Sequence, residues 1–192
     1  MAGDKNLKRR SKAGPSRIQE NIQNTNVITN QQVLNNDLLH IAETEELGLA
    51  DLPNGKISVP LNIWLDHKDE LLKRDIKVAV QIAADEDPND LSEDLNKIDT
   101  IVLPFVTYVD GRSYSHAHKL RTQFNFSGEI RAVGDVHYDQ LDFLNRVGCD
   151  AFELPDDENQ EAALKALEEY SEVYQPSADE GRLIFSRRRA VH

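Results

Sequence analysis

The chain has 192 residues, of which 39% are hydrophobic, so it is long enough for one domain with a buried core. Its formal net charge is -12, but the first 17 residues carry +5 and the last 17 carry +2, which leaves the interior at -19. A body this acidic repels phosphate backbones, which argues against nucleic acid as the main partner. The single cysteine excludes an intrachain disulfide and is typical of the reducing cytoplasm.

The two ends of the chain differ in composition from its middle. Residues 1–25 are almost all polar and are predicted to be a disordered basic tail, and residues 176–192 a second basic tail. Residues 26–175 are predicted to form a single α/β domain. No apolar run approaches the roughly 20 residues that cross a bilayer, and the chain start lacks the apolar stretch of an export signal. We therefore expect a cytoplasmic protein with no membrane association.

The first part of the domain carries weak strand signals. Val27-Ile28 and residues 37–41 are apolar enough for two short strands. Pro53-Asn54-Gly55 indicates a turn, and the strand that we expect at residues 57–59 follows it. A helix is predicted from Leu61 to Lys73, with Pro60 in the first turn, where its missing N–H is harmless.

From residue 78 onward, short runs rich in Val and Ile alternate with amphipathic stretches of helical length, which is a βα pattern. The expected strands are 78–82, 101–105, 130–134 and 151–154, and the last expected helix is 159–170. The intervening helices imply parallel pairing, and Gly148 is placed for a left-handed helix cap. The predicted fold is therefore α/β with a parallel sheet, partial TIM-barrel-like. An open flavodoxin-like sheet is the alternative, and the lack of a dinucleotide fingerprint favours the barrel.

Ligands of parallel α/β folds gather at the carboxyl ends of the strands, so the residues after each expected strand are candidates for a site. At the start of one expected helix, Arg112, Ser113 and Ser115 could bind sulfite, phosphate or a carboxylate, and Asp135 could add a polar contact. An equally weighted alternative is that Asp110 and Ser113 cap the helix while Arg112 pairs with Asp135 or Glu153. The anion site requires the loops bearing Arg112, Asp135 and Glu153 to share one rim of the sheet.

Three polar residues are weaker candidates, namely Arg131, His137 and Glu153. Arg131 lies inside an expected strand, on the side opposite to its apolar neighbours, where its charge requires a carboxylate partner or solvent, and an ion pair with a neighbouring acid is the favoured account. His137 beside Asp135 could move protons, although a histidine at a helix start is more often a plain surface residue.

The remaining residues with reactive side chains do not predict a reaction. His116 and His118 are two apart and fall on different helix faces, which excludes a shared zinc site. Cys149 is interpreted as a packing residue. The sequence contains no GxGxxG, Walker A, GxSxG or HExxH motif, so it predicts neither a cofactor nor a metal site.

Several blocks of the sequence resemble a known family. They are Asp110-Gly111-Arg112-Ser113-Tyr114-Ser115, then residues 128–136, 139–141 and 148–154, together with Val59-Pro60-Leu61 and Trp64-Leu65. These blocks resemble the bacterial family of unknown function numbered nine hundred and thirty-four, labelled a probable oxidoreductase involved in sulfite reduction. The resemblance extends from Ile57 to Gln175.

The resemblance implies an accessory protein of assimilatory sulfate or sulfite reduction that acts with sulfite reductase. The alternative is an enzyme or binding protein for an anionic sulfur metabolite or nucleotide held at the strand carboxyl ends. The family label also leaves open a role as an oxidoreductase component. The sequence indicates no particular oligomeric state.

Overall fold

The computed structural model of the chain describes residues 26–42, 52–107, 110–155, 158–168 and 177–178. The predicted tails, residues 1–25 and 176–192, lie outside the described residues except for positions 177 and 178.

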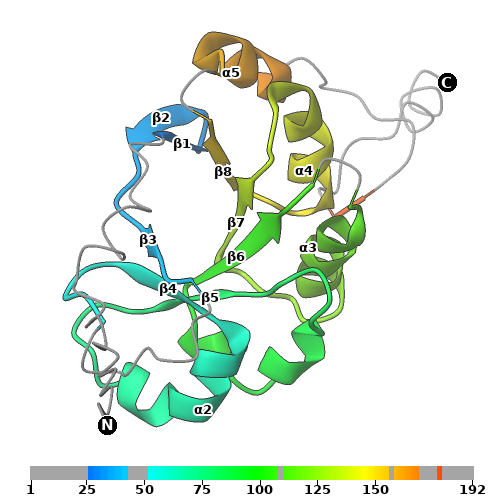
Figure 1. Cartoon of the computed structure of the whole chain (residues 1–192). Coiled ribbons are helices and arrows are strands. Elements are labelled where there is room, and N and C mark those ends of the chain that lie inside the picture. The colour runs from blue at the N-terminus through cyan, green and yellow to red at the C-terminus, as the bar shows by residue number, and fades with distance from the viewer. Residues whose placement is uncertain (1–25, 43–51, 108–109, 156–157, 169–176, 179–192) are drawn as a thin grey trace, which may run out of the picture.

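The described residues form one eight-stranded sheet that curls into a half-barrel (Figure 1). Its strands are β1 (Asn26–Thr29), β2 (Gln32–Asn35), β3 (Leu39–His40), β4 (Ile57–Pro60), β5 (Ala79–Gln81), β6 (Thr100–Phe105), β7 (Glu129–Gly134) and β8 (Ala151–Leu154). Their order in the sheet is β2-β1-β8-β7-β6-β5-β4-β3. Strands β3 to β8 pair in parallel, and β1 pairs antiparallel with both β2 and β8. The mostly parallel sheet and the partial barrel confirm the predicted fold class.

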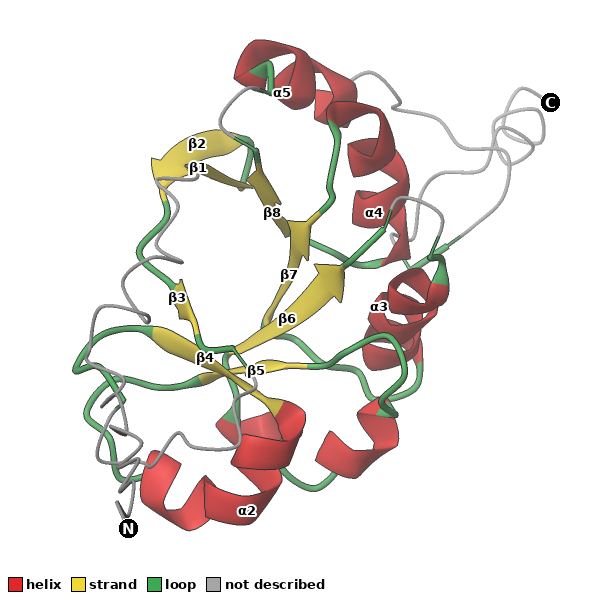
Figure 2. Cartoon of the chain, in the orientation of Figure 1, coloured by secondary structure: helices red, strands yellow, loops and turns green. Residues whose placement is uncertain are grey.

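The helices lie on the outer face of the curled sheet (Figure 2). They are α2 (Leu61–Leu71), α3 (Arg112–Thr122), α4 (Leu141–Val147) and α5 (Gln160–Glu168), with 3-10 helices η2 (Pro88–Leu91), η3 (Leu95–Lys97) and η4 (Tyr138–Gln140). The main apolar core fills the layer between sheet and helices, where Trp64, Leu120 and Leu144 pack against outward-facing strand residues. Burial of this layer is the principal stabilising contribution.

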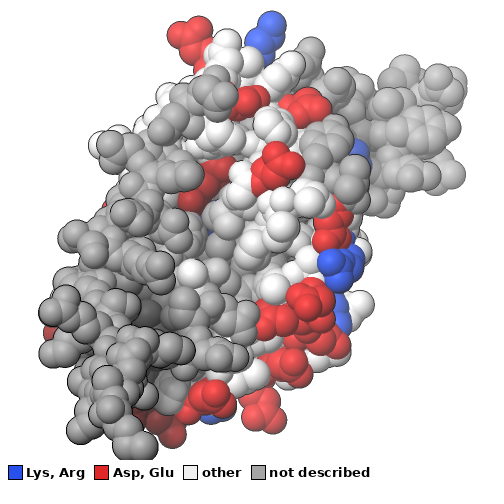
Figure 3. All heavy atoms as spheres, viewed as in Figure 1, with Lys and Arg blue, Asp and Glu red and all other residues white. Residues whose placement is uncertain are grey.

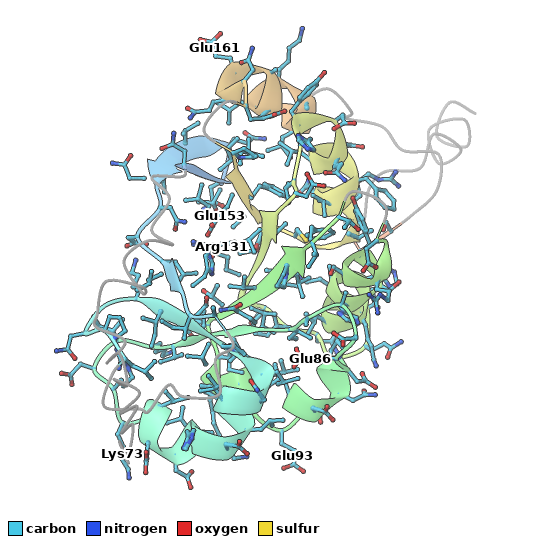
Figure 4. The ribbon with its side chains drawn as sticks, viewed as in Figure 1. Lys73, Glu86, Glu93, Arg131, Glu153 and Glu161 are labelled. Atoms are coloured by element: carbon cyan, nitrogen blue, oxygen red, sulfur yellow. The ribbon has the colours of Figure 1, made fainter. Side chains whose placement is uncertain are left out.

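Alternation along the strands separates two environments. In β7, Ile130 and Ala132 are fully buried in the apolar core, whereas Arg131 points into the half-barrel (Figure 4). The strand register pairs Arg131 with Val102 of β6, and Val102 with Gln81 of β5. These three residues therefore lie at the same level of the sheet and on the same face. One face of the sheet is therefore apolar, and the other holds charged and polar side chains such as Gln81 and Arg131 together with the apolar Val102.

The predicted elements differ from the structure mainly in the first part of the domain. The sequence did not predict β2, which forms a hairpin with β1 through Asn30 and Gln31, both with positive φ (49° and 57°). The helix expected at 61–73 ends at Leu71, and Pro60 is the last residue of β4. Gly148 has φ 118°, which confirms the predicted left-handed cap of α4.

Candidate functional site

The loops that bear Arg112 and Asp135 leave the same edge of the sheet. Strands β6 and β7 pair along their whole length, with Phe105 opposite Gly134, and Asp135 N donates to Phe105 O at 2.7 Å. The carboxyl ends of these strands therefore lie side by side, as parallel pairing requires.

Arg112 is paired with Asp110. The guanidinium donates to both oxygens of that carboxylate, at 3.0 and 2.7 Å, while the Arg112 side chain stays 59% exposed. Asp110 also accepts from Arg112 N at 3.2 Å, and its pKa is lowered to about 2 chiefly by the hydrogen bond from the guanidinium. The predicted pairing of Arg112 with Asp135 or Glu153 was therefore wrong, because a carboxylate two residues away reaches the guanidinium first.

The two serines of the predicted anion site differ in accessibility. Ser113 is 1% exposed, and its hydroxyl donates to Pro104 O at 3.0 Å, which fixes the start of α3 to the end of β6. Ser115 is exposed on α3. Of this pair, only Ser115 lies at the surface beside Arg112.

His137 lies between two carboxylates. Its Nε2 is 3.0 Å from Asp135 Oδ1, and its Nδ1 is 3.5 Å from Glu158 Oε2. The hydrogen bond to Asp135 is the largest influence on the pKa of His137 and raises it, and Glu158 raises it further. The side chain of His137 thus connects its own loop, which follows β7, with the loop that follows β8.

Glu153 does not lie on the predicted rim. It is 6% exposed inside β8, and its side chain points into the half-barrel (Figure 4). Phe152 and Leu154 belong to the apolar core between sheet and helices, so alternation directs the intervening Glu153 inward. The expectation of one rim therefore holds for Arg112 and Asp135 and was wrong for Glu153.

Arg131 is the cationic centre of the interior. The residue is 8% exposed, and its Nε donates to Glu129 Oε1 at 2.8 Å while its Nη1 donates to Glu153 Oε1 at 3.1 Å. Asn36 Oδ1 accepts a further bond from Nη1 at 3.1 Å. The carboxylate partner that the sequence predicted for Arg131 is confirmed, and two carboxylates share the role.

A chain of hydrogen bonds continues from Glu153 to the far side of the half-barrel. Gln81 Nε2 lies 3.0 Å from two backbone carbonyl oxygens, of Ile41 and Ser58, which identifies it as the donor end of the amide. The same nitrogen lies 3.0 Å from Ser58 Oγ, which is 2.7 Å from His40 Nδ1. His40 Nε2 lies 3.0 Å from Glu153 Oε2, which completes the connection.

We call His40, Ser58, Gln81, Arg131 and Glu153 the polar layer. It connects β3 and β4 with β7 and β8 across the interior, where complete barrels of this type pack bulky aliphatic side chains. Sequence reasoning missed His40, Ser58 and Gln81. The sequence did contain a signal for two of them, because Ser58 and Gln81 are each a single polar residue between two apolar ones.

Cys149 is 1% exposed within the core, and burial raises the pKa of its thiol. The thiol therefore stays protonated at neutral pH. This environment is that of a packing residue.

The connection between β5 and β6 carries a concentrated negative charge. Residues 85–94, here called the acidic connection, contain six carboxylates and no Lys or Arg. Asp87 pairs with Lys119, and the buried Asp94 pairs with Lys68 and Lys97. Figure 3 shows acidic side chains gathered on this side of the molecule.

These features define a half-barrel α/β protein with a polar interior. A family model described as bacterial protein of unknown function (DUF934) matches residues 79–185, more than half of the chain, so the protein belongs to that family. This confirms the resemblance seen in the sequence. The match includes Gln81, Arg131 and Glu153 and begins after His40 and Ser58.

No curated protein matches the chain. Within the described part of the chain, no helix has the length and apolar character needed to cross a membrane.

Proposed function

We propose that the protein is a cytoplasmic accessory partner of sulfite reductase in assimilatory sulfite reduction. The resemblance to a family labelled in this way supports the pathway. The acidic connection is the observation that supports docking, because an exposed acidic segment suits a basic face on a partner.

Part of the charge on the acidic connection is available to a partner. Asp85, Asp90 and Glu93 are exposed, and none of them forms an ion pair with a described residue. The negative charge of these three carboxylates would steer a basic surface toward this side of the protein. Such steering is screened within about 8–10 Å at physiological salt, so binding should weaken as salt rises.

The test uses purified sulfite reductase in a pull-down and in a rate assay. We expect the reductase to retain the protein at low salt and to change its rate when the protein is added. The variant Asp90→Asn/Glu93→Gln should weaken both effects, whereas Asp75→Asn/Glu161→Gln, which removes the same charge from exposed residues elsewhere, should not. Failure of the reductase either to bind the protein or to respond to it rejects the proposal.

A second candidate function is binding or turnover of an anionic sulfur metabolite or nucleotide at the start of α3. The exposed Arg112 and the adjacent loop with Asp135 and His137 favour it, with either of the latter moving protons. An incoming anion would have to replace Asp110 on the guanidinium.

Thermal melting with sulfite, sulfate and adenylylated sulfate tests this second function. A bound anion should raise the melting temperature, and Arg112→Ala should abolish the shift. Asp110→Asn removes the competing carboxylate and should increase the shift. If none of the anions raises the melting temperature of either the natural protein or the Asp110 variant, the start of α3 is not an anion site.

A deletion strain separates both functions from a role unrelated to sulfur. We expect the strain to grow poorly on sulfate as the sole sulfur source and to recover when cysteine is supplied. Equal growth of the deletion and parent strains on sulfate would argue against both.

A further inference from the structure

A cavity of about 340 Å³ opens at the amino ends of the strands, the opposite end of the sheet from Arg112. Ala79, Thr100 and Glu129, which begin β5, β6 and β7, line it. Its volume falls within the range of about 300–1,000 Å³ that is typical of small-molecule sites. Its inner wall includes Arg131 of the polar layer.

The inner wall places a hydrogen-bond donor next to an acceptor. Arg131 Nε and Nη2 both approach Glu129 Oε1, at 2.8 and 2.7 Å, so Nη2 keeps a second hydrogen and Oε2 of Glu129 accepts no bond from a described residue. The Arg131 side chain is only 9% exposed and the Glu129 side chain 27%. In such a partly dehydrated setting, hydrogen bonds to charged groups are strong.

The mouth of the cavity adds two further pairs of opposite charge. Lys56 pairs with Asp37, and Lys77 pairs with Asp99, with all four side chains more than half exposed. Exposed pairs of this kind contribute little to stability, so a ligand can displace them at low cost.

The lining restricts the class of ligand. Three cations and three carboxylates surround the cavity. A purely anionic ligand would be repelled by the three carboxylates, and a purely cationic ligand by the three cations. A ligand that carries both charges a few ångströms apart avoids this repulsion. Ile76, Val78 and Leu38 add an apolar part of the wall that suits a short aliphatic group.

We propose that this cavity binds a free zwitterionic α-amino acid with a short side chain. Its carboxylate accepts from Arg131 Nη2, its ammonium group donates to Glu129 Oε2, and its side chain lies against Ile76 and Val78. The polar layer stays intact, because Arg131 holds Glu153 and Asn36 through Nη1 and not through Nη2. The site is independent of the proposed docking function.

The test measures thermal melting and calorimetric titration of the full chain with glycine, alanine, serine and valine. Propionate and ethylamine serve as matched probes that carry one charge each. At least one amino acid should raise the melting temperature, whereas neither single-charge probe should do so at the same concentration. The proposal is overturned if no amino acid raises it, or if propionate or ethylamine raises it as much.

Variants locate the binding. Glu129→Gln keeps an acceptor for Arg131 but removes the charge that holds the ammonium group, and should weaken binding about tenfold or more. Glu161→Gln, the same change at an exposed position on α5, should leave binding unchanged. Unchanged affinity in folded Glu129→Gln contradicts the proposal. If that variant does not fold, amide NMR shifts of the natural protein decide: perturbation at Ala79 and Thr100 supports the site, and perturbation confined to other residues overturns it.

Discussion

At the residue scale, His137 shows how neighbouring carboxylates shift the pKa of a side chain on a loop. Its ring nitrogens meet Asp135 and Glu158, from the loops that follow β7 and β8. Both carboxylates favour the imidazolium form, and their effect on the pKa outweighs that of partial burial.

We predict that the pKa of His137 in an NMR titration lies above the ordinary value of about 6.5 and falls in Asp135→Asn. Because the folded pKa is raised, the stabilising contribution is complete below the unfolded pKa and is lost as the pH rises through the folded value. The difference in free energy of unfolding between the natural protein and His137→Gln should thus be largest on the acidic side of this window. The effect will be small, because the side chain is 40% exposed. A difference that grows with rising pH would contradict the assignment.

At the element scale, one arginine in the last turn of α3 organises the loops at the amino ends of β7 and β8. Arg121 donates to the carbonyl oxygens of Phe126, Gly128 and Gly148 at 2.6–2.9 Å. Its Nη2 also donates to Asp150 at 2.9 Å, and Asp150 in turn accepts from Ile130 N. A planar fork of donors is required to serve these acceptors together.

Arg121→Lys should therefore lower the free energy of unfolding by about 2 kcal/mol although it keeps the charge, because an ammonium group leaves carbonyl acceptors unpaired. Urea denaturation with an unchanged m-value is the measurement. Arg112→Lys is the matched control, since Arg112 is exposed and should tolerate the change. Equal stability of the two variants would show that the Arg121 network adds nothing beyond charge.

At the scale of the whole molecule, the polar layer connects the two sides of the half-barrel. His40 on β3, at one end of the sheet order, contacts Glu153 on β8, five strands away through the ladder. In the sequence these residues are 113 positions apart. The contact thus supports the curl of the sheet directly across its interior.

His40→Ala should lower the free energy of unfolding by about 2 kcal/mol, because the Ser58 hydroxyl and Glu153 lose their partner in a buried setting. A double-mutant cycle with Glu153→Gln should give a coupling energy of about 1 kcal/mol. His118→Ala, a change at an exposed position on α3, should have little effect. A coupling energy near zero would show that the contact across the interior does not stabilise the fold.

Local patterns in the chain were sufficient to predict much of this architecture. The βα pattern of short apolar runs between helical stretches marked β7 and β8 within one residue, and Gly148 marked the end of α4. These predictions succeeded because a strand, a helix and a cap each depend on residues only a few positions apart. The β1–β2 turn escaped prediction because Asn30-Gln31 lacks the glycine that usually marks such hairpins.

The polar contacts inside the half-barrel could not be predicted from local patterns, because they join residues that are distant in the sequence. Alternation indicated that Arg131 needed a carboxylate, and Glu153 on the adjacent strand β8 supplies one, but only the curl of the sheet brings His40 of β3 to Glu153. Alternation along β8 places Glu153 inside the barrel and not at the expected rim, and Arg131 also lines the cavity at the amino ends of the strands. Strand identity is a property of short segments, whereas the meeting of residues 113 positions apart depends on how all the intervening strands pack and twist.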